Sequence, residues 1–144
     1  MFSKACEYAI RALIFIAQKS QAGERTGIKD IAKGVDSPEP FLAKILQDLG
    51  RKGLVQSVKG PHGGFYMEGE HLKTTLADVV NAIDGDKLFT GCGLGLQACS
   101  EKKPCPIHDE FKIIRRKIQS MLETTTVGEF NKQLENGLAF LKRS

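Results

Sequence analysis

The sequence predicts a mainly α fold with one small β-hairpin. Apolar residues recur at helical spacing along most of the chain. Two short helical stretches joined by a tight turn precede an alternating, β-branched stretch that turns back at GPHGG. This order is that of a winged helix-turn-helix, in which the hairpin is the wing. Further helical stretches follow a loop with three cysteines, and we expect a long C-terminal dimerisation helix among them.

Composition limits the class of protein. The chain has 144 residues, of which 41% are hydrophobic and 26% are charged, and this suits one compact domain. It contains no run of about 18 apolar residues, so we expect no membrane partner. It opens without a secretory signal pattern, which predicts a cytoplasmic protein. The formal net charge of +4 permits an anionic partner such as nucleic acid.

The first part of the chain predicts three helices. The first spans 2–19 and is apolar on most faces, so we expect it to be buried against both the core and a second subunit. Thr26 is predicted to cap a short second helix that ends at Gly34. Ser37 as N-cap, followed by a proline at the first helical position, predicts a third helix that runs to about Arg51.

A hairpin and a fourth helix are expected next. The alternating stretch 54–59 and the shorter stretch 65–67 flank the GPHGG turn, which predicts two antiparallel strands. Thr75 and Asp78 match a capping box, in which each side chain bonds the backbone of the other residue. The box predicts a helix that continues through Ile83.

Two more helices are predicted beyond the cysteine loop. Cys105 as N-cap and a proline at the first position open a long helix to about Leu122. Its predicted apolar seam consists of Phe111, Ile114, Ile118 and Met121 or Leu122. Thr126 and Glu129 form a second capping box, which starts a last helix. The residues expected to point inward from that helix are Phe130, Leu134, Leu138 and Leu141.

The third helix is expected to enter the major groove of DNA. The outward positions on its first turns are Glu39, Pro40, Ala43, Lys44 and Gln47. Ser37 lies at its N-terminus, where backbone amides favour a phosphate. At the hairpin tip, Lys59 or His62 would enter the minor groove, and Gly63 and Gly64 would let the backbone approach the sugar-phosphate wall. The alternative interpretation is an ordinary turn beside a solvated lysine face.

The loop from Cys92 to His108 concentrates metal-ligating residues. Cys92, Cys99 and Cys105 are separated by six and five residues, and His108 follows after two more. Structural zinc sites use paired cysteine knuckles, which this loop lacks. Wide spacing in a glycine-bearing loop suits an iron–sulfur cluster, either [2Fe–2S] or [4Fe–4S]. A metal-free loop that senses oxidants through its thiols is the alternative. Cys6 belongs to the apolar first helix, and we interpret it as core.

Three segments of the chain carry a family resemblance. They are SKACEYAIRAL, PFLAKILQDLGRKGLVQSVKGPHGGFYM and the cysteine loop. Together they resemble the BadM/Rrf-type winged-helix transcription regulators, which include the iron–sulfur assembly regulator IscR and the nitric-oxide sensor NsrR. The resemblance covers nearly the whole chain. It implies a homodimeric bacterial repressor or activator that binds a palindromic operator on double-stranded DNA.

The resemblance also implies a fourth ligand beside the three cysteines, and two residues compete for that role. His108 matches the histidine of IscR, whereas Glu7 stands where some relatives place a carboxylate that reaches the cluster of the other subunit. We prefer His108. Taken without the resemblance, Glu7 forms an i,i+4 ion pair with Arg11. Ala43 and Lys59 replace a glutamate and an arginine of the family's DNA face, so we do not carry over the family's DNA specificity.

These observations predict a homodimeric DNA-binding transcriptional regulator that is not an enzyme. We expect it to sense iron–sulfur status, nitric oxide or redox state. Neither a nucleotide-binding glycine fingerprint nor a pair of carboxylates beside a base supports catalysis. We expect 1–85 to be the DNA-binding domain, 86–108 the cofactor loop and 109–144 the dimerisation helices. A metal-free thiol regulator and a small iron–sulfur redox protein are the alternative functions.

Overall fold

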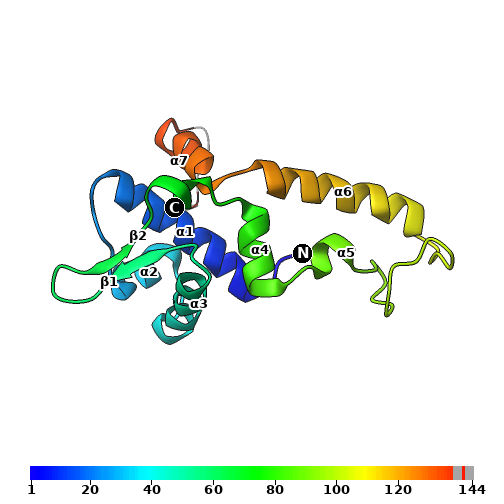
Figure 1. Cartoon of the computed structure of the whole chain (residues 1–144), viewed down its shortest axis with the longest axis horizontal. Helices are drawn as coiled ribbons and strands as arrows, with labels where there is room; N and C mark the ends of the chain where they lie inside the picture. The colour runs from blue at the N-terminus through cyan, green and yellow to red at the C-terminus, as the bar shows by residue number, and fades with distance from the viewer. Residues whose placement is uncertain (138–140, 142–144) are drawn as a thin grey trace.

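A computed structural model describes residues 1–137 and residue 141 of the chain. It confirms a mainly helical fold with a two-stranded antiparallel hairpin. The elements in order are α1 (Lys4–Gln21), α2 (Ile28–Val35), α3 (Glu39–Arg51), β1 (Gln56–Val58), β2 (Gly64–Tyr66), η1 (Gly69–Lys73), α4 (Leu76–Asp84), α5 (Lys87–Thr90), α6 (His108–Thr124) and α7 (Val127–Glu135). In Figure 1, α6 extends away from α1, α2 and α3, with the cysteine loop at its far end.

The first helix, α1, is the centre of the core. It packs against α2, α3, α4 and α7, so it has neighbours on most sides, as its apolar faces predict. Its side chains Leu13, Ile14 and Ile16 are at most 1% exposed. Burying a side chain of this size contributes roughly 1.5–3 kcal/mol. The helix begins at Lys4 because the hydroxyl of Ser3 accepts a hydrogen bond from the Cys6 amide at 3.0 Å.

The prediction that Thr26 caps α2 is wrong. Gly27 is the N-cap, and no side chain bonds the first turn. Thr26 is buried and instead pairs with Phe65 of the hairpin, to which it donates a backbone hydrogen bond at 3.0 Å and from which it accepts one at 2.8 Å. A cap would need the Thr26 hydroxyl at the helix end. The backbone pairing to β2 determines the path of the chain here.

The predicted end of α2 at Gly34 is wrong by one residue. The helix continues to Val35, and Asp36 then takes the left-handed conformation, with φ 54°. An aspartate tolerates that conformation better than most residues do. Gly34 therefore lies inside the helix. Only glycine fits at this position, because α1 approaches it closely. A Cβ atom added there would lie 2.3 Å from the Phe15 ring.

The third helix begins one residue later than predicted. Pro38 is the N-cap, Glu39 is the first helical residue, and no side chain caps the helix. Ser37 is therefore not the N-cap; its hydroxyl donates to the Pro38 carbonyl at 3.3 Å. The inward face is as predicted, because the residues facing the core are all buried: Leu42, Ile45, Leu46 and Leu49.

The hairpin is shorter than predicted. Its register pairs Gln56 with Tyr66 and Val58 with Gly64. Val55, just before β1, is 3% exposed and anchors the hairpin to the core. Gly64 has φ 143°, and a Cβ atom added there would lie 2.9 Å from the backbone of Thr26.

Both predicted capping boxes are confirmed. At α4, the Asp78 amide donates to the Thr75 hydroxyl at 3.1 Å, and the Thr75 amide donates to the Asp78 carboxylate at 2.9 Å. Thr126 and Glu129 form the same box at α7. The sequence did not indicate the short helices η1 and α5.

The predicted seam of α6 is only partly buried in this chain. Leu122 is fully buried, and Ile118 packs beside it, whereas Ile114 and Met121 are exposed. On the last helix, Phe130 and Leu134 pack against the core as predicted. Leu141 is 39% exposed, so the prediction that it points inward is wrong. Leu138 lies outside the described residues. Across the described helices, none is long and apolar enough to cross a membrane.

We expect Gly64→Ala to lower the free energy of unfolding by about 1–3 kcal/mol, because the new side chain meets backbone in a strained conformation. Gly50→Ala is the matched control. A Cβ atom at Gly50 meets nothing nearer than 3.9 Å, and alanine favours the helix. Urea unfolding followed by circular dichroism gives both values. Equal unfolding midpoints would contradict the close packing of β2 on Thr26.

Candidate nucleic-acid interface and cysteine loop

The outer face of α3 presents all five positions predicted to approach DNA. The exposed residues are Glu39, Pro40, Ala43, Lys44 and Gln47. The opposite face of the helix is buried in the core, so the outer face is held in a fixed orientation. Ser37 is half-buried in the turn just before the helix. This side of the molecule can therefore approach a groove of a duplex without any rearrangement of the core.

The hairpin tip carries the other residues predicted to contact DNA. Lys59 and His62 are exposed, and Gly63 and Gly64 are half-buried. The Gly63 amide donates to the Gly60 carbonyl at 3.0 Å and closes the turn. A Cβ atom at Gly63 would lie 2.0 Å from the Val58 carbonyl oxygen, so only glycine fits there. The two glycines shape the tip, and the lysine and histidine are its polar side chains.

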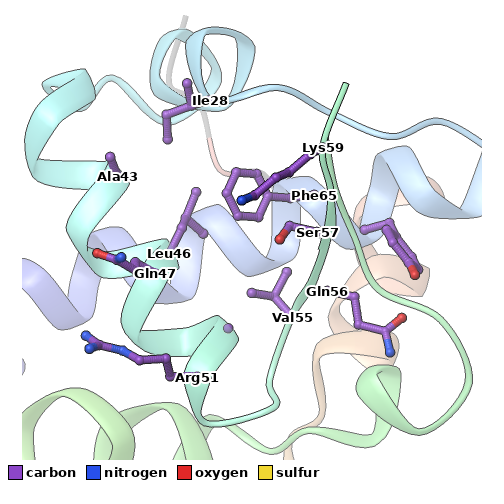
Figure 2. Close-up of a pocket in the computed structure, with 12 residues that line it drawn as sticks. Ile28, Ala43, Leu46, Gln47, Arg51, Val55, Gln56, Ser57, Lys59 and Phe65 are labelled. Carbon is purple, nitrogen blue, oxygen red and sulfur yellow. The ribbon is translucent and has the colours of Figure 1, made fainter. Parts of the chain in front are cut away.

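A groove of about 830 Å³ separates α3 from the hairpin (Figure 2). Its floor is apolar and includes Leu46, Val55 and Phe65. Lys59 reaches from the hairpin towards α3 in Figure 2. Arg51 and Gln56 also line the groove, although neither was among the predicted DNA contacts. Arg51 follows Gln47 by four residues, so helical spacing was the signal that would have placed it on the same face.

The start of the cysteine loop is fastened to α6. Arg115 donates a hydrogen bond from Nη1 to the Gly91 carbonyl at 2.7 Å. Gly93 lies against the Phe111 ring, where an added Cβ atom would be 2.9 Å from the nearest ring carbon. Arg115 was not among the predicted functional residues. Its position four residues after Phe111, on the same side of the helix, was the available signal.

The prediction that Cys105 is the N-cap of α6 is wrong. The helix begins at His108, with Ile107 as its N-cap. The His108 amide donates to the Cys105 carbonyl at 3.0 Å, so these four residues form a turn. Pro106 occupies the second position of that turn, which its fixed φ favours. Cys105 therefore lies three residues before the first residue of α6.

The four candidate ligands lie as two pairs. The Sγ atoms of Cys92 and Cys105 are 4.0 Å apart. Cys99 Sγ lies 3.4 Å from Nδ1 of His108. In the part of the chain that the structure describes, no three or more such side chains gather closely enough to hold a single metal ion. The arrangement therefore offers two two-ligand sites.

The Cys92 thiol is surrounded by backbone amides. The Leu94 amide donates to Cys92 Sγ at 3.4 Å. Hydrogen bonds from this amide and from the Leu96 amide lower the pKa of the Cys92 thiol from its usual value. Such bonds favour the thiolate, which is the form that binds metal and reacts with electrophiles.

His108 is held between Cys99 and Glu101. The imidazole is 5% exposed, and its Nε2 lies 3.3 Å from Glu101 Oε2, without hydrogen-bond geometry. Glu101 also forms an ion pair with Lys112 of α6. The ammonium of Lys112 and the His108 ring together lower the pKa of the Glu101 carboxyl. A carboxylate on the far nitrogen is the usual partner of a metal-binding histidine, because it orients the ring.

The fourth cysteine, Cys6, and the alternative ligand Glu7 both lie on α1. Cys6 is fully buried, which confirms that it belongs to the core. Its burial, together with the nearby Asp84 and Glu7 carboxylates, raises the pKa of the Cys6 thiol to about 12. Glu7 is half-buried near the start of α1, whereas the loop lies at the far end of α6 (Figure 1). The structure therefore brings His108, and not Glu7, to the cysteines within one chain.

Residues 2–133 match the family model Rrf2, described as "Iron-dependent Transcriptional regulator". A protein of Aquifex aeolicus that bears the name of an HTH-type transcriptional regulator is 33% identical over 129 residues, which cover 88% of each chain. The HTH-type transcriptional regulator IscR of Xenorhabdus nematophila is 28% identical over 128 residues, covering 89% of this chain and 77% of the relative.

Two solved structures share the fold. CymR, described as the global cysteine regulator of B. subtilis, superposes with a TM-score of 0.74 at 21% identity, covering 92% of this chain and 96% of CymR. IscR of T. potens superposes with a TM-score of 0.75 at 18% identity, covering 97% of this chain and 92% of IscR. These similarities confirm the predicted winged-helix fold.

We expect the loop thiols and the core thiol to differ in reactivity. Iodoacetamide at pH 8 should modify Cys92, Cys99 and Cys105 in the folded protein but leave Cys6 unmodified. With a pKa of about 12, only roughly one Cys6 thiol in 10,000 is ionised at that pH, and burial blocks access. Peptide mass spectrometry identifies the modified residues, and guanidinium should expose all four. Equal rates at Cys6 and Cys92 in the folded protein would contradict the assignment.

Proposed function

Because the chain belongs to the Rrf2 family of transcriptional regulators, which are not enzymes, we propose that it is a homodimeric sensor of iron–sulfur or redox status. Its cysteine loop holds a [2Fe–2S] cluster. The state of that cluster adjusts the affinity of α3 and the hairpin for a palindromic operator in the bacterial cytoplasm. The observation that carries the proposal is the arrangement of four loop side chains as two pairs.

The two pairs fit a two-metal group. A tetrahedral metal with thiolate bonds of about 2.3 Å holds two sulfurs about 3.8 Å apart, and a sulfur and an imidazole nitrogen about 3.5 Å apart. The observed separations are 4.0 Å for Cys92 and Cys105, and 3.4 Å for Cys99 and His108. In a [2Fe–2S] cluster each iron takes two protein ligands. Cys92 and Cys105 would hold one iron, and Cys99 and His108 the other.

The surroundings of His108 support its role as the fourth ligand. Its Nδ1 faces Cys99, and Glu101 faces the other ring nitrogen. When bound, the cluster would supply reversible one-electron chemistry and reactivity towards nitric oxide or oxygen. The chain would supply the ligands, the amides around Cys92 and the Glu101 carboxylate that orients the ring.

Control of DNA binding follows from where the loop lies. It joins α5, which packs on the core, to α6, which extends away from the core (Figure 1). Binding, loss or reduction of the cluster would change how far the loop draws α5 and α6 together. If α6 pairs two chains, that change alters the distance between their two α3 helices. Operator affinity then differs between the two states of the loop, as a switch requires.

We expect protein purified without oxygen to be brown, with about two irons and two sulfides per chain. Replacing Cys92, Cys99 or Cys105 by alanine should abolish both the colour and the cluster-dependent change in DNA affinity. Cys6→Ala is the matched control and should keep both. Absorption spectra, iron and sulfide analysis and duplex titrations provide the measurements. Colourless wild-type protein after attempted reconstitution would contradict the proposal, and about four irons per chain would contradict the two-pair ligation.

The separation of Cys92 and Cys105 also favours a second candidate, a metal-free thiol sensor. Two thiols 4.0 Å apart can form a disulfide after a small movement. One molecule of hydrogen peroxide would take two electrons and two protons from them, leaving one disulfide and two waters. Colourless protein whose DNA affinity changes with peroxide, and is restored by dithiothreitol, would support this candidate over the cluster.

The exposed apolar side of α6 supports pairing of two chains. Ile114 and Met121 are 53% and 49% exposed, although each is large and apolar. Ile114 and Met121 lie seven residues apart, so they share one side of the helix. A second copy of α6 would cover this side, and two-fold symmetry would place the two α3 helices in successive major grooves.

We expect Ile114→Glu to convert the dimer into a monomer, because a charge would be buried in the apolar contact. Arg116→Glu places the same charge on the opposite, polar side of α6 and should leave the dimer intact. Light scattering coupled to size-exclusion chromatography measures the mass. Identical masses for the two variants would exclude α6 as the pairing surface.

A further inference from the structure

Two cations on α1 converge on a single aromatic ring. The Lys4 ammonium lies 5.4 Å from the centroid of the Tyr8 ring, and the Arg11 guanidinium lies 5.0 Å from it. An aromatic face attracts cations at such distances. The ring therefore contacts two positive side chains of α1, one four residues before Tyr8 and one three residues after it.

No carboxylate neutralises this pair. Within the described part of the chain, neither Lys4 nor Arg11 has an acidic group within 4.0 Å. The i,i+4 ion pair between Glu7 and Arg11, which the sequence allowed, is not formed. Each cation therefore keeps a positive charge that no acidic side chain of the described chain neutralises, and an anion at this surface would be attracted by both. The arrangement favours an anionic ligand here.

The site adjoins the DNA-facing helix. The Tyr8 ring packs edge-on against Phe41 of α3, with centroids 5.7 Å apart and an interplanar angle of 81°. Phe41 is 40% exposed and follows Pro40 in the first turn of α3. The two cations thus lie beside the end of α3 that is expected to enter the major groove. At that place the nearest anion is the phosphate backbone that borders the groove.

We propose that Lys4, Tyr8 and Arg11 form a binding site for a DNA phosphodiester beside each α3 half-site. The ammonium, the guanidinium and the phenol hydroxyl can all donate hydrogen bonds to phosphate oxygens. Contacts of this kind determine the position of a protein on the duplex and carry no sequence information. The site would set how deeply α3 enters the groove. This inference rests on the DNA binding described under the proposed function.

The test is a salt titration of DNA affinity with variants of the full-length protein. The probes are a duplex selected by the wild-type protein from a random library, and a scrambled duplex of equal length. Lys4→Ala and Arg11→Ala should each lower the log–log salt slope by about 0.9 per chain, because each chain loses one phosphate contact; at 0.1 M salt this weakens binding roughly eightfold per chain, or about 60-fold for the dimer. Both duplexes should be affected equally.

Three further variants and a stability measurement separate this role from a structural one. Lys132→Ala removes an exposed cation from α7, on the other side of the core from α3 in Figure 1, and should leave the slope unchanged. Arg11→Lys keeps the charge and should retain most of the slope. Thermal unfolding of each variant tests whether it still folds. Tyr8→Leu, which removes the ring that orients both cations, should weaken binding without changing the number of charges.

The outcomes distinguish the two levels of inference. If Lys4→Ala and Arg11→Ala behave like Lys132→Ala while Lys59→Ala weakens binding, the α1 site is wrong and DNA binding stands. If the wild-type protein selects no duplex, both the proposed function and the α1 site are wrong. A loss confined to the selected duplex would also overturn the proposal, because a phosphate contact cannot depend on sequence in that way.

Discussion

Burial of α1 on nearly every side is the constraint on which the other elements depend. The helices α2, α3, α4 and α7 all pack against it, so its apolar faces organise the core. The cost of exposing so many apolar residues makes this packing stable. The outer face of α3 is consequently fixed relative to α1. Residues at the polar edge of α1, such as Lys4 and Arg11, then have a fixed place beside the DNA-facing helix.

The cysteine loop is built on a different principle. It lies at the outer end of α6, away from the core centred on α1 (Figure 1). Its described polar contacts are made with α6: Arg115 donates a hydrogen bond to the Gly91 carbonyl, and Lys112 forms an ion pair with Glu101. A segment with few buried apolar contacts opens at little cost in free energy. Binding of a cofactor, or formation of a disulfide, can therefore change its conformation while the core stays folded.

The two capping boxes could be predicted from the sequence, because each depends only on residues within one helical turn. The capping boxes at Thr75 and Thr126 depend on residues three apart, and both are formed. Prediction from the sequence failed where a distant segment decides. Thr26 pairs with the hairpin instead of capping α2, and Gly34 is needed because Phe15 packs on it.

The cysteine loop shows the same limit. The sequence named its four candidate ligands, but their arrangement depends on contacts it does not display. A turn at Pro106 moves Cys105 out of the helix, and Arg115 and Phe111 fix the start of the loop. The division into two pairs is a consequence of that path. Spacing along the chain could not distinguish two two-ligand sites from one four-ligand site.

Packed side chains connect the two helices that flank the cysteine loop, α5 and α6, to α3 through α1. A second apolar cluster joins Phe89 of α5, Ile118 of α6 and Cys6 of α1. Two residues after Cys6, Tyr8 contacts Phe41 of α3. Close-packed side chains transmit displacement because they cannot be compressed. A movement of α5 against α6 therefore has to be taken up by α1 or by rotation of α6. The first would shift the Tyr8 site and α3 together, whereas the second would change only the spacing between two chains.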